Sequence, residues 1–165
     1  MTTEQKTLTV AGRMVQGNIF EPQTTDMKGN PLRDQKGDPK VQYFFALAVE
    51  KNSPEWAGVW QELSAIAQRD FPGGQSQKPD FSWKIVDGDK PENAGKEGFP
   101  GHWVFRFTSG FPIQAAADNG TRPILNKDEI KRGYYLRVWF KSQGNGDNMQ
   151  PGIYLNPVGV LLPLS

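Results

Sequence analysis

The residues best suited to chemistry in this sequence form an alternating run over residues 133–141. Successive side chains of a β-strand point to opposite faces, so the run divides into two stripes. One stripe is apolar and suits a core: Tyr134, Leu136, Val138 and Phe140. The other alternates rings with cations: Tyr135, Arg137, Trp139 and Lys141. Rings stack on bases and cations neutralise phosphates, so this outer stripe predicts a platform for single-stranded nucleic acid. Cross-strand packing of the aromatic rings is the alternative interpretation.

Four residues outside this run extend the candidate surface: Arg13, Tyr43, Lys84 and Arg106. Arg13 and Tyr43 each lie in a predicted strand, and a curved strand would present Tyr43 at a groove. Arg106 alternates with an apolar stripe, which leaves its side chain pointing outward. The prediction is that the cations of both sets neutralise phosphates while the aromatic rings stack on bases of any sequence.

Charge is distributed unevenly along the chain, although its sum is close to zero. The 165 residues include 19 Lys and Arg and 18 Asp and Glu, for a formal net charge of +1. Residues 101–165 hold seven basic and four acidic residues, and residues 130–142 hold four cations and no acid. The molecule is therefore not uniformly basic, but its positive field is concentrated near the alternating run.

Composition and motifs argue against several other classes of function. The absence of cysteine excludes disulfides and thiolate metal sites and fits a reducing cytoplasm. Abundant glycine (18) and proline (13) favour one β-rich domain over residues 1–165, with long loops. No catalytic or phosphate-cradling motif occurs, and His102 is the only histidine, so neither an enzyme nor a cofactor is predicted. Asp87 and Asp89 form a carboxylate pair that suits a hard cation, but Asp-Gly is foremost a turn signal, so no metal is predicted.

The hydrophobic periodicities predict mainly strands. Strands are expected over residues 7–15, 41–50, 81–86, 102–108, 111–117, 133–141 and 153–162. Long polar connections are expected over 23–40 and 87–101, and turns over 118–120 and 144–148.

One helix is predicted between Ser53 and Pro72. Ser53 is the expected N-cap, with Pro54 at the first helical position. Six apolar residues then recur at helical spacing: Trp56, Val59, Trp60, Leu63, Ile66 and Ala67. Such a stripe is more often core than ligand site, so the helix is expected to cover one end of a barrel or sheet.

Several short motifs occur in an order that resembles the small bacteriophage single-stranded DNA-binding proteins. The motifs are Ile19-Phe20-Glu21-Pro22, the strand from Val41 to Lys51, Asp87-Gly88-Asp89 with Pro91, Gly101-His102-Trp103, and the strand that opens with Gly133-Tyr134-Tyr135. Each motif is only moderately specific, and their order carries the resemblance, which spans residues 7–161. The resemblance implies a mainly β OB-fold, that is, a five-stranded Greek-key barrel with extra strands, long loops and one amphipathic helix.

The resemblance also implies a function. It implies sequence-nonspecific binding and protection of single-stranded DNA during phage replication or recombination, in the host cytoplasm. Replication proteins are a further expected class of partner, and the oligomeric state, monomer or dimer, stays open. Many such proteins recruit enzymes through an acidic tail, but no acidic residue follows Asp147 here, which puts recruitment through that end in doubt. The alternative is a β-rich phage structural or protein-interaction module that uses the aromatic stripe on protein or sugar.

Overall fold

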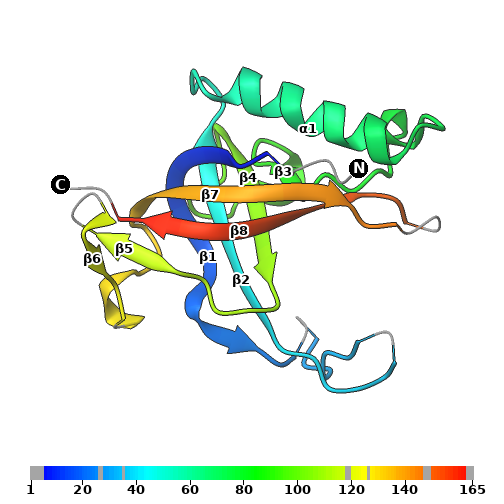
Figure 1. Ribbon diagram of the computed structural model, residues 1–165. Helices are drawn as coiled ribbons and strands as arrows, with labels where there is room; N and C mark the ends of the chain where they lie inside the picture. The colour runs from blue at the N-terminus through cyan, green and yellow to red at the C-terminus, as the bar shows by residue number, and fades with distance from the viewer. Residues whose placement is uncertain are drawn as a thin grey trace.

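The computed structural model describes residues 6–25, 28–34, 36–117, 120–125, 127–146 and 150–162. Its main feature is one long strand, β1 (Leu8–Gln23), which extends well beyond the predicted end at residue 15. The first part of β1 pairs antiparallel with β7 (Tyr135–Gly144), and the later part pairs antiparallel with β2 (Gln42–Glu50). β1 therefore belongs to both halves of the sheet (Figure 1).

Five of the described strands form a barrel. β2 also pairs with β4 (His102–Ser109), and β7 also pairs with β8 (Ile153–Leu161). β4 lies against β8 and closes the barrel, although the described parts of these two strands form no ladder with each other. This is the partly open five-stranded barrel of an OB-fold, as the resemblance implied.

Short elements extend the barrel. β3 (Ile85–Asp87) pairs with β4, while β5 (Ala115–Ala117) and β6 (Arg122–Pro123) continue the sheet beyond β8. Three described segments are 3₁₀ turns: η1 (Gln75–Gln77), η2 (Pro91–Asn93) and η4 (Lys127–Glu129). No helix in the described ranges has the length and apolar character needed to cross a membrane.

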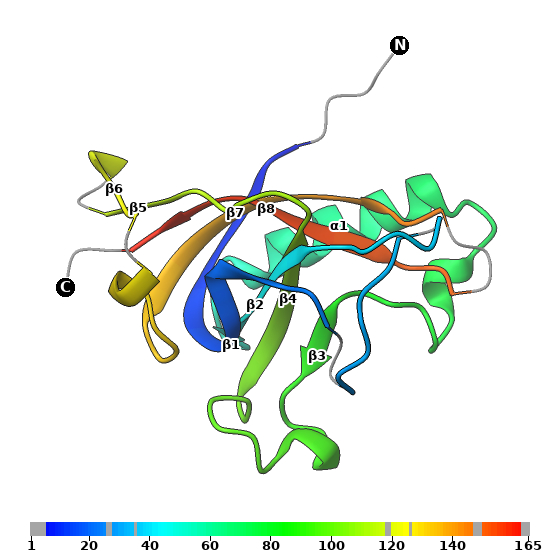
Figure 2. The same ribbon diagram turned by 90° about the horizontal axis from the view of Figure 1, so that it is seen from below.

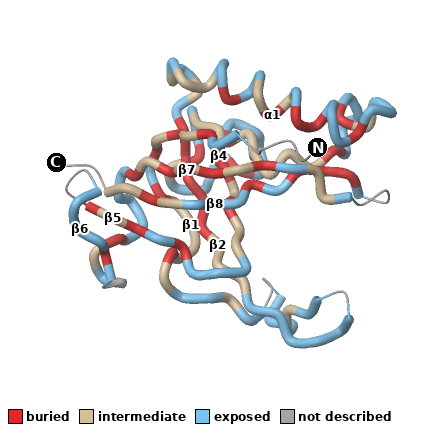
Figure 3. Tube along the Cα trace, in the orientation of Figure 1, coloured by how far each residue is buried: buried red, intermediate tan, exposed pale blue. Residues whose placement is uncertain are grey.

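The barrel core consists of the inner stripe of each strand. Four rings in it are completely buried: Phe45, Phe105, Phe107 and Phe140. Figure 3 shows the buried residues concentrated where the strands cross. The predicted inner stripe of β7 is confirmed for Leu136, Val138 and Phe140, whereas Tyr134 precedes the strand and is 40% exposed.

The helix α1 (Trp56–Asp70) lies along one side of the barrel, roughly parallel to β7 (Figure 1). Its buried residues are Val59, Leu63, Ile66 and Ala67. The predicted cap is wrong: Glu55 is the N-cap, because Ser53 and Pro54 form a turn in which the Trp56 amide donates to the Ser53 carbonyl. The core prediction is also wrong for Trp60, which is 37% exposed at the edge of the packed surface.

Four tryptophans form a continuous row between α1 and the barrel. The ring centroids of Trp103 and Trp56 are 5.1 Å apart, those of Trp56 and Trp60 are 5.6 Å apart, and those of Trp60 and Trp83 are 4.6 Å apart. Trp56, Trp83 and Trp103 also pack against the core. The row therefore fastens the helix to the barrel.

Three predicted segments differ from the structure in extent. The strand predicted over 81–86 is reduced to β3, because residues 82–84 bond alternately to β8 and β4 instead of following one partner. The strand predicted over 111–117 is reduced to β5, and Phe111 is 79% exposed on the connecting loop. The predicted turns over 118–120 and 144–148 lie partly outside the described residues.

The two predicted connections differ in how they pack. The connection between β1 and β2 is polar in sequence, as predicted, and its described residues (24–25, 28–34 and 36–41) are mostly exposed (Figure 3). The connection after β3 is long, as predicted, but Phe99 in it packs on Ala46, Ala48 and Val104 on the outer face of β2 and β4. Figure 2 shows β3 and this loop on the opposite side of the molecule from β7 and β8.

One lysine fastens the connection after β3. The Lys51 ammonium lies 2.5 Å from the Asp87 carboxylate, 2.8 Å from the Asp89 carboxylate and 4.4 Å from the centre of the Trp103 ring. Asp89 also accepts the Gly101 amide at 2.8 Å, which ties the two ends of the loop together. The carboxylate pair thus has a lysine as its partner.

We expect Gly12→Ala to lower the free energy of unfolding by about 1–3 kcal/mol, the usual cost of overpacking. An added Cβ at Gly12 would lie 2.2 Å from the Ala48 carbonyl oxygen, and that oxygen belongs to the backbone of β2 and is not free to move aside. Gly58→Ala is the matched control with the opposite sign, because a Cβ there meets open space on α1 and gains about 1 kcal/mol of helix propensity. Denaturant unfolding measures both changes, and equal stability of the Gly12→Ala variant and the parent would contradict the packing argument.

We expect Lys51→Met to lower the melting temperature at neutral pH by removing both ion pairs. The lysine hydrogen bonds lower the pKa of Asp87 and of Asp89, so their contribution is present above the ordinary carboxyl pKa of about 4 and is lost as the pH falls through the lowered values. The difference in melting temperature between the parent and Lys51→Met should therefore narrow in acid. Lys90→Met, in the same loop, is the control, and a difference that persists undiminished at the lowest pH would contradict the role of these carboxylates.

Candidate nucleic-acid interface

The structure places the eight predicted site residues in different surroundings. Four of them lie on the outer face of β1 and β7: Arg13, Tyr135, Arg137 and Trp139. Lys84 and Arg106 are neighbours on another side of the barrel, where β4 faces β8. Lys141 lines a pocket between these two surfaces, and Tyr43 is half-buried against the core.

On the β7 face, two cations are engaged by the protein itself. The Arg137 guanidinium donates to both carboxylate oxygens of Glu55, at 2.9 and 3.2 Å, and to the Thr9 hydroxyl at 3.1 Å. Arg13 donates to the Gly133 carbonyl at 2.7 Å. A bidentate carboxylate is a strong partner for arginine, so a phosphate would have to compete with Glu55 for Arg137.

The aromatic members of the β7 face are more accessible. Tyr135 is 51% exposed, and Trp139 is half-buried. The residue opposite Trp139 on β8 is Gly159, which brings no side chain to that position. Gly159 therefore leaves the indole without a directly opposed side chain on β8.

The seam between β4 and β8 is closed by a short segment of backbone. The Ser82 amide donates to the Pro151 carbonyl at 3.0 Å, and the Ile153 amide donates to Ser82 at 2.9 Å, which binds the segment to β8. Two residues later, the Arg106 amide of β4 donates to the Lys84 carbonyl at 2.8 Å. The chain must turn between these partners, and Lys84 has a φ of +60°, the only positive value at a non-glycine residue in the described chain. Such a backbone conformation is costly for a residue with a side chain.

Lys84 and Arg106 bring two positive charges together at this seam. Burial lowers the pKa of the Lys84 ammonium, and the nearby Arg106 charge lowers it further. Neither side chain has an acidic partner within the described ranges. The pair is therefore an electrostatic cost to the free protein that a bound anion would relieve.

The Arg106 guanidinium lies over an aromatic ring, Phe44, that was not among the predicted site residues. Its guanidinium carbon lies 5.1 Å from the centre of the Phe44 ring on the outer face of β2. Strand alternation places Phe44 and Tyr43 on opposite faces of β2. In the structure, the Tyr43 side chain packs against the barrel core and the Phe44 side chain lies on the outer face. A guanidinium held in this way offers a charged, planar surface on which a base can stack.

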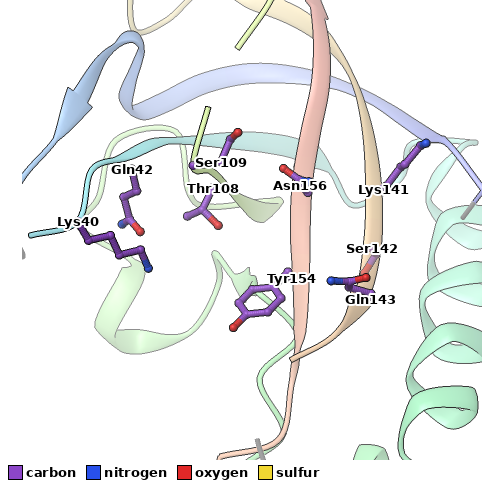
Figure 4. Close-up of a pocket in the computed structure, with 10 residues that line it drawn as sticks. Lys40, Gln42, Thr108, Ser109, Lys141, Ser142, Gln143, Tyr154 and Asn156 are labelled. Carbon is purple, nitrogen blue, oxygen red and sulfur yellow. The ribbon is translucent and has the colours of Figure 1, made fainter. Parts of the chain in front are cut away.

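A pocket of about 270 Å³ adjoins this pair. Ten residues from four strands and the loops beside them line it: Lys40, Gln42, Thr108, Ser109, Gly110, Lys141, Ser142, Gln143, Tyr154 and Asn156. Thr108 lies two residues beyond Arg106 on β4 and pairs with Phe44 of β2, so the pocket is continuous with the Lys84–Arg106 surface. In Figure 4, Lys40 points toward Tyr154, whereas the Lys141 side chain points away from the other labelled residues. Of these ten residues, only Lys141 was predicted, since the pocket joins strands that are distant in sequence.

Comparison with known proteins finds matches to the structure but none to the sequence. The sequence matches no protein-family model and no curated protein. The structure, however, has the OB-fold architecture of bacteriophage single-stranded DNA-binding proteins.

Solved structures that are similar over most of the chain include the following three. The single-stranded DNA-binding protein of bacteriophage Enc34 in complex with ssDNA has a TM-score of 0.73 and 13% identity, covering 94% of this chain and 85% of that one. A C-terminal truncation of the Enc34 protein has a TM-score of 0.74 and 14% identity, covering 96% and 86%. The single-stranded DNA-binding protein gp2.5 of bacteriophage T7 has a TM-score of 0.67 and 13% identity, covering 97% and 87%. At these identities the similarity is one of fold.

We expect Lys84→Met to raise the free energy of unfolding at neutral pH. Methionine keeps a long side chain at the same backbone position but removes the desolvated charge beside Arg106. Below the lowered pKa of Lys84 the cost of that charge is fully present, and it disappears as the pH rises through that value toward the ordinary lysine pKa of about 10.4. The advantage of the variant should therefore shrink at alkaline pH.

Denaturant unfolding across this pH range measures the effect, with the exposed Lys78→Met variant as control. A Lys84→Met protein that is less stable than the parent at neutral pH would show that the lysine stabilises the free fold.

Proposed function

We propose that this protein binds single-stranded DNA without catalysis, and does so in phage DNA replication or recombination inside the host cell. The observation that carries the proposal is the pair of cations, Lys84 and Arg106, held together at the β4–β8 seam with no acidic partner in the described chain. A polyanion supplies the missing charge. The fold agrees with this proposal, since the similar structures are single-stranded DNA-binding proteins and one of them was solved in complex with ssDNA.

The proposed path of the strand begins at the seam. Phosphates would lie near Lys84 and Arg106, and bases would stack on the Arg106 guanidinium, which itself lies on Phe44. From there the strand would cross the pocket to Lys141 and continue along the outer face of β7 toward Trp139 and Tyr135. Contacts of this kind bind any sequence, because stacking and charge do not depend on the edges of the bases.

We expect Arg106→Met and Lys84→Met each to weaken binding to a labelled oligo-dT. Each variant should also reduce the slope of log affinity against log salt by about 0.7, the value for one lost phosphate contact on a single strand. Fluorescence anisotropy between about 50 and 200 mM salt measures both quantities. Arg69→Met, which removes a cation at the end of α1, is the matched control for net charge. Seam variants that bind like this control would place the DNA elsewhere.

Trp139→Ala tests the second part of the path. Loss of one stacked base should cost about 1–3 kcal/mol of binding free energy and leave the salt slope unchanged, because no phosphate contact is removed. Unchanged affinity would confine the DNA to the seam and the pocket. The same titration series measures this variant.

A further inference from the structure

The pocket beside the seam has a lining unlike that of a phosphate channel. Three of its side chains are primary amides, from Gln42 on β2, Gln143 on β7 and Asn156 on β8. An amide offers both donors and acceptors, as the edge of a nucleobase does. Tyr154 adds a ring that is 44% exposed. The amides and the ring therefore suit a flat, polar group, and Lys40 adds a cation at the edge of the pocket (Figure 4).

Several of these polar groups have unused hydrogen-bonding capacity. The side chains of Gln42, Thr108 and Asn156 form no hydrogen bond with another described residue. The Ser142 hydroxyl, in a residue that is only 3% exposed, has no partner among the described residues either. Buried polar groups in folded proteins are normally paired, so this serine also indicates a place where a ligand or water completes the structure.

The size and position of the pocket fit one base of a bound strand. Its volume of about 270 Å³ is just below the range of about 300–1,000 Å³ typical of sites for drug-sized ligands. It opens beside the Arg106–Phe44 pair, where Thr108 pairs with Phe44 across β2 and β4. Lys40 points toward its centre from the edge, in position to meet the phosphate of a base that enters (Figure 4).

We propose that this pocket takes a single nucleobase turned out of the stacked path and reads its edge with the amides of Gln42 and Asn156. The Tyr154 ring forms one wall against the base. This inference rests on the proposed function and adds a property that stacking does not provide: a preference for one kind of base. The preference arises because a base with a matching edge gains hydrogen bonds to these amides that a base with another edge does not form.

The test compares binding of the full chain to oligo-dT, oligo-dC, oligo-dA and a strand of abasic residues, by anisotropy at one salt concentration. The parent should favour one base by at least about fivefold, which is the lower end of the discrimination given by one bidentate amide–base contact. Asn156→Ala and Gln42→Ala should each reduce this ratio toward one while retaining binding. Gln61→Ala, an exposed amide on α1, should keep the ratio of the parent.

The possible results separate this inference from the proposed function. Equal affinity of the parent for all three bases would overturn the base-reading pocket and leave DNA binding intact. A preference that survives in both Asn156→Ala and Gln42→Ala would also overturn it, since the preference would then come from stacking strength alone. Failure to bind any strand, oligo-dT included, would overturn the proposed function and this inference together.

Discussion

The barrel depends on one strand being shared by two partners. β1 pairs with β7 through Arg13 and with β2 from Arg13 onward, so a single continuous backbone holds both halves of the sheet. The change of partner requires the backbones to approach closely, and Gly12 provides the space because a Cβ there would collide with the Ala48 carbonyl. This crossing holds β2 and β7, whose outward faces carry Phe44 and the stripe from Tyr135 to Lys141, on either side of one strand.

Closure on the far side of the barrel determines where positive charge is left unpaired. The β4–β8 seam is joined through residues 82–84, so Lys84 lies where the chain turns from one strand to the other. There the lysine meets Arg106 instead of an acid. On the β7 face the opposite occurs, since the start of α1 brings Glu55 to Arg137. Two surfaces with similar residue types therefore differ in the charge that they offer to a ligand.

Alternation and spacing predicted the local structure well. The inner stripe of β7, the buried face of α1 and the outward direction of Arg106 all follow from periods of two and 3.6 residues. The pairing of Arg137 with Glu55, 82 residues away, depends on where the helix packs and has no local signal. Whether Tyr43 or Phe44 lies on the outer surface likewise depends on which face of β2 the barrel encloses. The pocket could not be predicted, because its lining comes from four strands that only the closed barrel brings together.

The tryptophan row between α1 and the barrel has an optical consequence. Along the row from Trp103 to Trp83, the centroids of neighbouring indole rings are 4.6–5.6 Å apart. At such separations, excitation energy absorbed by one indole can be transferred to the next. Emission then comes from whichever indole has the lowest excited state, not from the one that absorbed. The chain places Trp83 directly before Lys84, so a disturbance at the seam would reach the whole row. The emission of these four of the five tryptophans is therefore a collective signal of the contact between helix and barrel, with one end of the row at the seam and Trp139 outside it.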